Sequence, residues 1–205
     1  MIKLSKVILD LWCIMNIETY IKDSIKTKES ILNDKKILTT LTNIVDEIVF
    51  AYKNGNKVMT AGNGGSAGDA QHIAGELVSK FNFDRPPLAA LELNSNSPLL
   101  TAISNDYGYE SSFSRQILAN GKKGDIFIAI STSGQSKNII KAVETANDLD
   151  IITIGLLGCK LSPLDTLCKH VIKIPSTNTP IIQESQIMLG HIICGLVEER
   201  IFLNY

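Results

Sequence analysis

The stretch Lys57-Val58-Met59-Thr60-Ala61-Gly62-Asn63-Gly64-Gly65-Ser66-Ala67 joins a short apolar run to a glycine-rich turn, and a helix-like pattern follows it. A second stretch repeats this arrangement with hydroxyl side chains in the turn: Asp125-Ile126-Phe127-Ile128-Ala129-Ile130-Ser131-Thr132-Ser133-Gly134-Gln135-Ser136. A helix N-terminus leaves several N–H groups unpaired and carries partial positive charge, so an anion binds well there. Glycines allow close approach, and Ser and Thr hydroxyls donate further hydrogen bonds. The two turns predict a site for a small phosphorylated ligand.

Other interpretations of the first turn remain open. Residues 62–67 fit the relaxed dinucleotide fingerprint G-x-G-x-x-A, although a lone match is often a plain strand-to-helix turn. A dinucleotide-dependent enzyme also needs an acidic residue at the end of a second strand about 20 residues further on. Glu92 is a poor candidate because it lies beyond that distance. The hydroxyl-rich second turn suits a terminal phosphate better than a buried pyrophosphate.

The composition excludes several classes of protein. With 205 residues, 44% hydrophobic content and a net charge of −1, the chain can bury a core and has no electrostatic bias toward nucleic acid or membrane. No apolar run approaches the ~20 residues of a membrane span. The four cysteines have neither metal-finger nor disulfide spacing, which suits a reducing cytoplasm, and Cys194 is expected in the core. We expect a cytoplasmic protein whose partner is a small molecule or another copy of itself, with no nucleic acid or membrane partner.

Short apolar runs alternate with longer helix-like patterns along the chain. Strands are expected at Lys57–Thr60, Leu88–Leu93, Asp125–Ser131, Ile151–Leu156 and Val171–Ile174. Helices are expected at residues 15–31, 35–54, 67–81, 98–104, 112–120, 136–148 and 180–201. Such alternation favours an α/β three-layer sandwich, with a parallel five-stranded sheet, helices on both faces and additional N-terminal helices. Ligands of such sheets bind at the carboxyl ends of the strands, where both turns lie. His170, just before the last strand, is expected to be exposed.

The first fourteen residues differ from the rest of the chain. Asp10 interrupts their apolar stretch and no small-residue cleavage site follows, which argues against a signal peptide. A cleaner amphipathic pattern begins at Met15. We therefore expect residues 1–14 to be a dispensable extension and residues 15–205 to form a single domain.

A second group of polar residues is divided between two predicted helices. His72 and Glu76 are four residues apart and share one helix face, as an ordinary surface pair also would. Gln183 and His191 lie in an apolar helical stretch, where buried polar groups need partners. An isolated His191 would be a hydrogen-bonded core histidine. Eight residues span about 12 Å of straight helix. Gln183 and His191 can therefore reach one centre only if the helix is irregular near residues 180–183 or if different subunits contribute.

The motifs that carry a family resemblance are Ala61–His72, Glu76, Asn105-Asp106-Tyr107-Gly108, Ser131–Ser136, Gln183-Glu184 and His191. Together they resemble the sedoheptulose 7-phosphate isomerases, also called phosphoheptose isomerases, which have the sugar isomerase (SIS) fold. The resemblance extends from about residue 15 to the C-terminus. One departure is Pro180-Ile181-Ile182 before Gln183, where the family often has charged residues or arginine, and it affects the finer substrate contacts.

The resemblance implies a role for each matching residue. The sugar phosphate would be held by Ser66, Ser131, Thr132, Ser133 and Ser136. The substrate would be contacted or framed by Asn63, Gly64, Gly65, Glu76, Asn105, Asp106 and Gln183. Glu76 and His191 would both take part in acid/base catalysis. Zinc, one ion per subunit and with partial occupancy in purified protein, would bind to His72, Glu76, Gln183 and His191. The family forms homotetramers with active sites between subunits, which would resolve the helix geometry.

The implied reaction converts sedoheptulose 7-phosphate to D-glycero-D-manno-heptose 7-phosphate, which supplies heptose for lipopolysaccharide or capsule. A base removes a proton beside the carbonyl, an enediolate is stabilised, and the proton returns at the neighbouring carbon. Zinc would polarise the carbonyl, although a glutamate that binds zinc is a poorer base. The alternative is a non-catalytic SIS protein, either a sugar-phosphate sensor or a replication-initiator partner. Such a protein would need the phosphate turns but could lack the carboxylate and the histidines.

Overall fold

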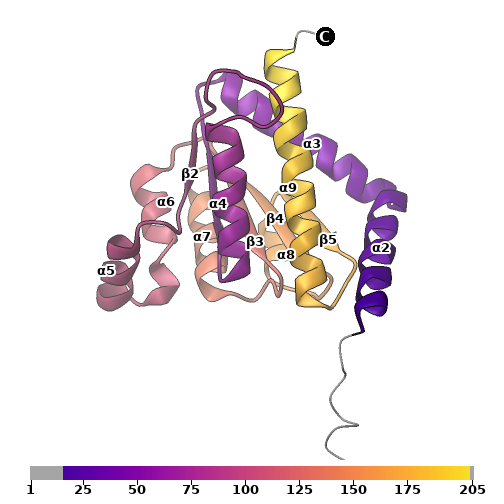
Figure 1. Cartoon of the computed structure of the whole chain (residues 1–205). Helices are drawn as coiled ribbons and strands as arrows, with labels where there is room; N and C mark the ends of the chain where they lie inside the picture. The colour runs from indigo at the N-terminus through magenta and orange to yellow at the C-terminus, as the bar shows by residue number, and fades with distance from the viewer. Residues whose placement is uncertain (1–15, 204–205) are drawn as a thin grey trace, which may run out of the picture.

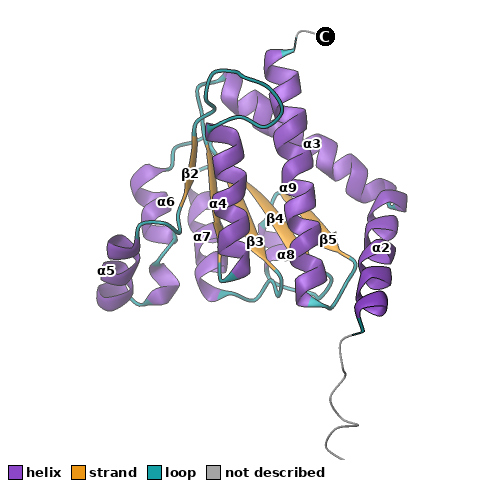
Figure 2. Ribbon diagram, viewed as in Figure 1, coloured by secondary structure: helices purple, strands orange, loops and turns teal. Residues whose placement is uncertain are grey.

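A parallel sheet of five short strands forms the middle layer of the computed structural model, which describes residues 16–203 (Figure 1). The strands are β1 (Val58–Gly62), β2 (Ala90–Glu92), β3 (Ile126–Ser131), β4 (Ile152–Gly158) and β5 (His170–Ile174). Their order is β2-β1-β3-β4-β5, and every neighbouring pair is parallel. All residues of β1 and β3 are buried, because helices cover both faces of the sheet (Figure 2). Burial on two faces explains why these strands are uninterrupted apolar runs.

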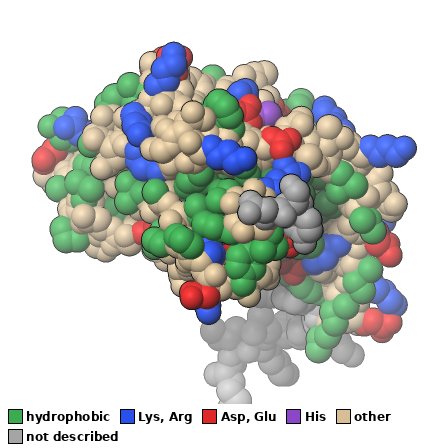
Figure 3. Space-filling model, turned by 90° about the horizontal axis from the view of Figure 1, so that it is seen from above, with side chains coloured by type: hydrophobic (Ala, Val, Ile, Leu, Met, Phe, Trp, Pro, Cys, Tyr) green, Lys and Arg blue, Asp and Glu red, His purple; other side chains and the backbone are tan. Residues whose placement is uncertain are grey.

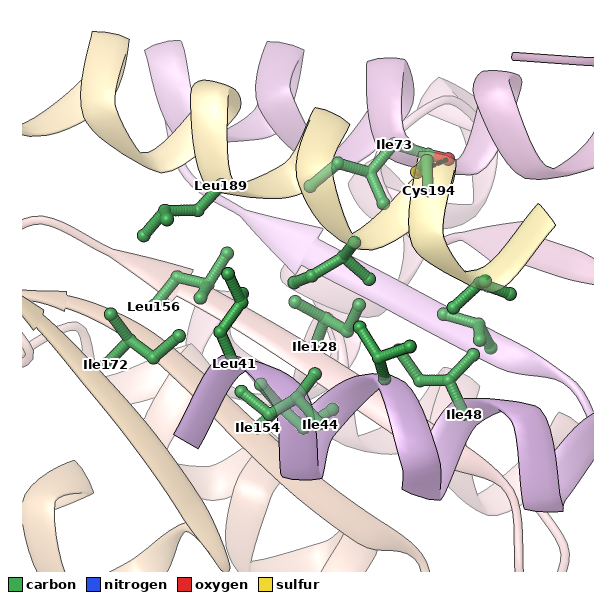
Figure 4. Close-up of a cluster of buried hydrophobic side chains, with 14 of the residues drawn as sticks. Leu41, Ile44, Ile48, Ile73, Ile128, Ile154, Leu156, Ile172, Leu189 and Cys194 are labelled. Atoms are coloured by element: carbon green, nitrogen blue, oxygen red, sulfur yellow. Dashed lines mark hydrogen bonds between the residues drawn. The ribbon is translucent and has the colours of Figure 1, made fainter. Parts of the chain in front are cut away.

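One face of the sheet is covered by α3 (Lys35–Lys53), α4 (Gly65–Val78) and α9 (Thr179–Phe202), and α2 (Ile17–Asn33) packs against α3 and α9. Figure 4 shows the core of this layer, where Ile44 and Ile48 of α3 meet Ile128 of β3. The opposite layer consists of α5 (Ser97–Tyr107), the 3₁₀ turn η1 (Tyr109–Ser111), α6 (Ser114–Asn120), α7 (Lys137–Asp148) and α8 (Leu164–Leu167). A second cluster, which includes Phe113 and Phe127, fills the space beneath it.

Local sequence signals set several helix boundaries. Asn16 accepts a hydrogen bond from the N–H of Thr19, and Asp34 accepts from the N–H groups of Lys36 and Ile37. The N–H groups in the first turn of a helix have no carbonyl partner within that helix, and these side chains accept hydrogen bonds from them instead. Asp34 also marks the end of α2, so one residue separates two helices of different direction.

The expected fold class and all five expected strands are confirmed. The sequence analysis missed α8, which is a single turn of four residues, and η1, which precedes α6. Cys194 is buried, as expected. The expectation for His170 is wrong, since only 16% of its side chain is exposed and its Nε2 lies 3.5 Å from Oε1 of Glu47. The predicted extension at residues 1–14 lies outside the described residues.

The sequence analysis found no apolar run as long as a membrane span, but helix α9 is both long and apolar. Its 24 residues and a mean hydropathy of 1.2 would be enough, by length and composition alone, to cross a membrane. However, 56% of this apolar window is buried inside the protein, where the helix packs against α3, α4 and the sheet. This is the environment of a core helix.

The surface also carries apolar side chains. Ile17, Ile21 and Ile25 recur every four residues on α2, and each is more than half exposed. On the face seen from above, apolar side chains gather near the middle and side chains of both charges surround them (Figure 3). The mixture of signs on this face agrees with the small net charge of the chain.

Candidate active site

The first glycine turn connects β1 to α4 in a shape that excludes larger side chains. A Cβ on Gly62 would lie 2.3 Å from the carbonyl oxygen of Ser66, and Gly64 has a φ of +57°, which favours glycine. The N–H of Ser66 donates to the carbonyl of Asn63 at 3.1 Å, which closes the turn. Ser66 is buried within the first turn of α4. The chain therefore directs a helix N-terminus and a hydroxyl toward the carboxyl edge of the sheet.

The second turn lies directly beside the first. Gly62 of β1 is paired with Ile130 of β3, so the residues that follow each strand emerge next to one another. The Oγ of Ser131 accepts the N–H of Gly134 at 3.1 Å and lies 3.4 Å from the Oγ of Ser136. In the same turn, the N–H of Gln135 donates to the Oγ of Ser133 at 3.1 Å. The predicted pairing of two hydroxyl-lined and glycine-lined turns is thus present in a single chain.

A cluster of His72, Glu76 and His191 lies further along α4 and α9. The Nε2 of His72 is 3.0 Å from Oε1 of Glu76 and 3.4 Å from Nε2 of His191. The ring of Phe81 lies 5.7 Å from that of His191 and shields one side of the cluster. About half of the His72 side chain and a quarter of the Glu76 side chain remain exposed. The sequence analysis left open that His72 and Glu76 form an ordinary surface pair. In the structure His191, a residue type that can bind metal, joins them from α9.

The donor atoms of this cluster suit a zinc ion. One ligand atom from each of the three residues lies within 4.8 Å of the others. When ligand atoms surround zinc as a tetrahedron at a metal–ligand distance of about 2.0–2.1 Å, neighbouring ligand atoms are about 3.3 Å apart. The distances from Nε2 of His72 to Oε1 of Glu76 and to Nε2 of His191, 3.0 and 3.4 Å, are close to that value. Two imidazoles and one carboxylate also form a set of donors that suits zinc better than it suits magnesium or calcium.

Gln183 does not join this cluster within one chain. Its Nε2 would be 2.3 Å from a Cβ on Gly65, so the amide lies across the first residue of α4. Gly65 precedes His72 by seven residues, or about 10 Å of helix. Because α9 is unbroken from Thr179 to Phe202, the irregularity considered near residues 180–183 is absent.

Asn105 and Asp106 form a separate pair near the end of α5. The amide of Asn105 donates to Oδ1 of Asp106 at 2.8 Å, and both side chains are exposed. Asp106 lines a cavity of about 250 Å³ together with Tyr107 and Arg115. Within the described part of the chain, neither residue is hydrogen-bonded to the turn after β1 or to the turn after β3. Their predicted contact with substrate is therefore not tested by a single chain.

The structure places Asp69, to which the sequence analysis assigned no role, on α4 next to the cluster. Asp69 lies one turn before His72 on α4, and one of its carboxylate oxygens is buried without a hydrogen-bond partner among the described residues. Burial raises the pKa of Asp69 to about 6, although the nearby charge of His72 opposes the shift. The three-residue spacing from His72 was the available sequence signal.

A buried ion pair fixes the end of α4 that carries Glu76. Arg85 donates from Nε to Oε2 of Glu198 at 2.9 Å, and neither side chain is more than 2% exposed. The same guanidinium donates to the carbonyl oxygens of Glu76 and Leu77 at 2.9 and 2.7 Å. These carbonyls are at a helix C-terminus, where a cation is favoured. The sequence analysis missed this pair because its members are 113 residues apart.

A parallel sheet covered by helices, with two glycine- and serine-containing turns at its carboxyl edge and a histidine–carboxylate cluster nearby, is the architecture of a class of protein suited to binding a sugar phosphate. The family model of the SIS domain matches residues 19–158. Phosphoheptose isomerase 2 of Campylobacter jejuni is 56% identical over 191 residues, which cover 91% of this chain and 95% of the relative. Phosphoheptose isomerase of Aneurinibacillus thermoaerophilus is 55% identical over 188 residues and covers 92% and 95%. The solved structure of a phosphoheptose isomerase from Francisella tularensis has a TM-score of 0.85 at 33% identity and covers 89% and 96%.

These matches show that the chain belongs to the SIS-domain family and, within it, to the phosphoheptose isomerases.

Proposed function

We propose that this protein isomerises sedoheptulose 7-phosphate to D-glycero-D-manno-heptose 7-phosphate. The observation that carries the proposal is the presence, in one chain, of the paired anion turns and the His72–Glu76–His191 cluster. The relatives named phosphoheptose isomerase, with more than half of their residues identical, support this substrate. The reaction would take place in the cytoplasm, and its product would supply heptose for lipopolysaccharide or capsule.

The two turns would bind the phosphate group. Ser66, Thr132 and Ser133 lie at the edge of the sheet where β1 and β3 end, and Ser131 and Ser136 place two hydroxyls 3.4 Å apart. A phosphate oxygen accepts hydrogen bonds from such hydroxyls and from the N–H groups of α4. Asn63, Gly64 and Gly65 would frame the same end of the substrate.

Glu76 and His191 would carry out the proton transfers. A base removes the proton from carbon 1 of the ketose, which leaves an enediolate across carbons 1 and 2. The proton then returns to carbon 2, and the hydroxyl proton of carbon 1 moves to the oxygen of carbon 2. Glu76 is the base best placed by its partial burial, and His191 can exchange a proton with the substrate oxygens.

Zinc fits the donor atoms of the cluster and would be bound by His72, Glu76 and His191, with Gln183 completing the set. When bound, the ion would polarise the carbonyl and stabilise negative charge on the substrate oxygens. The positions of Gln183 and of Asn105 and Asp106 favour a site completed by neighbouring subunits, as in a homotetramer. The apolar stripe of Ile17, Ile21 and Ile25 is a surface that such an assembly would cover.

The deciding experiment is incubation of the protein with sedoheptulose 7-phosphate, followed by NMR of the sugar phosphates. The aldoheptose phosphate should accumulate in a time-dependent manner, and the variant Glu76→Gln should form it about 10²–10⁴-fold more slowly. Binding of the ketose without turnover would instead support the non-catalytic sensor. Sedimentation analysis would separately test the tetramer.

A further inference from the structure

Two asparagines and one tyrosine form a closed hydrogen-bond network between the phosphate turns. Asn63 follows β1, Asn138 lies in the first turn of α7, and Tyr109 lies in η1. Each asparagine donates from Nδ2 to Oδ1 of the other at 2.9 Å. The hydroxyl of Tyr109 donates to Oδ1 of Asn63 at 2.8 Å. The network therefore joins three elements that are far apart in sequence.

The orientation of both amides follows from a backbone group. The N–H of Ile139 lies 3.0 Å from one terminal atom of Asn138, and because an N–H can only donate, that atom is the oxygen. The same oxygen faces Asn63, so Asn63 must present its nitrogen there. The Nδ2 of Asn138 then donates to Asn63 and, at 3.4 Å, to the hydroxyl of Ser112. All four hydrogen-bonding positions of the buried Asn138 are thus occupied.

This arrangement leaves Asn63 with a single free hydrogen-bonding group. Its oxygen accepts from both Asn138 and Tyr109, and one of its two N–H groups donates to Asn138. The other N–H has no acceptor within the described part of the chain. Asn63 can therefore offer the ligand a donor but no acceptor.

The tyrosine is itself fixed in place by α7. The two residues that follow Tyr109 in η1 bind lysines of that helix, since Glu110 accepts from Nζ of Lys137 and Ser111 accepts from Nζ of Lys141, each at 3.0 Å. Tyr109 is 56% exposed, so the contact of its hydroxyl with Asn63 does not depend on burial in the core.

We propose that Asn138 and Tyr109 are positioning residues that fix Asn63 as a hydrogen-bond donor to an oxygen of the sugar-phosphate substrate. The inference rests on the proposed function and deepens it. A fixed donor suits a phosphate or hydroxyl oxygen and needs no rearrangement when the substrate binds. Without the tyrosine hydroxyl, one lone pair of Oδ1 is unoccupied and the amide is held by fewer bonds.

The test is a double-mutant cycle of Tyr109→Phe and Asn63→Ala in the full-length protein. Tyr109→Phe alone should raise KM and the dissociation constant for sedoheptulose 7-phosphate roughly three- to tenfold, the effect of one hydrogen bond. It should leave kcat within about twofold and the melting temperature unchanged. In the Asn63→Ala background, Tyr109→Phe should have no further effect, because Tyr109 acts through Asn63.

The matched control is Tyr107→Phe, since Tyr107 is also 56% exposed and its ring, stacked under Arg115, is retained in phenylalanine. Equal affinities of the Tyr109→Phe and Tyr107→Phe variants would overturn the inference, as would additive effects in the cycle. If the wild type binds the ketose phosphate without converting it, the proposed function fails and the dissociation constants still decide the inference. If the wild type binds none of it, both fail.

Discussion

Replacing Arg85 by methionine should destabilise the protein strongly. The substitution removes the cation from Glu198, whose side chain is fully buried, and leaves that carboxylate with only the backbone N–H groups of Phe81 and Asn82 as donors. Breaking a buried ion pair by removal of one partner costs about 3–5 kcal/mol. For a chain of this length, each kcal/mol shifts the melting temperature by roughly 2–4 °C, so Arg85→Met should melt roughly 6–20 °C lower.

The effect should depend on pH in a defined direction. Burial alone would raise the pKa of Glu198, but the N–H groups of Phe81 and Asn82 and the adjacent Arg85 outweigh it and hold that pKa below its ordinary value. A depressed carboxyl pKa stabilises the folded state above the pKa of the unfolded chain, and this contribution is lost as the pH falls through the folded pKa. The difference between wild type and Arg85→Met should therefore be greatest near neutral pH and decrease on acidification below about pH 4.

Calorimetry at a fixed protein concentration would measure both effects, since assembly also contributes to the melting temperature. Lys123→Met is the matched control. It breaks an exposed pair in which Lys123 Nζ lies 3.2 Å from Oδ2 of Asp150, and such surface pairs contribute at most about 1 kcal/mol. The reasoning is refuted if Arg85→Met melts within about 2 °C of that control at neutral pH.

Three further predictions concern the active site. Glu76→Gln should fold and bind sedoheptulose 7-phosphate, but its turnover in the NMR assay should fall by about 10²–10⁴-fold. The amide keeps the shape of the side chain but lacks the basic oxygen. Retention of more than about a tenth of wild-type activity would argue against an acid/base role. Alanine at Ser131, Ser133 or Ser136 should weaken substrate binding by about 1–3 kcal/mol in calorimetric titration with little change in kcat, and normal affinity would make the second turn structural. Chelation should lower activity and zinc should restore it, while His72→Ala should reduce bound zinc in elemental analysis without weakening phosphate binding. Full activity of verified metal-free protein would exclude a zinc-dependent mechanism.

The sequence predicted the sheet well because the strands are buried on both faces and stand out as apolar runs. Strand β3, for example, was expected at Asp125–Ser131 and is Ile126–Ser131. The short helix α8 escaped notice because a single turn has no periodicity that a sequence pattern can show. His170 was misjudged because its partner Glu47 lies on another element, 123 residues away.

The candidate site was predictable where its signals are local. The turn at residues 62–66 and the four-residue spacing of His72 and Glu76 both follow from the sequence alone. The approach of His191 to His72 depends on the packing of α4 against α9, which no local pattern specifies. For the same reason, the partners Asn138 and Tyr109 of Asn63 became visible only in three dimensions.

Helix α9 carries Gln183, His191 and Glu198, and it is the last element in the part of the chain that the structure describes. The ribosome adds about 5–20 residues per second, so β1 and its turn precede the complete α9 by on the order of ten seconds. During that interval Ile73 and its apolar neighbours on α4 lack the helix that covers them in the native state. The nascent chain therefore exposes these apolar side chains of α4 until α9 has been synthesised and can pack over them.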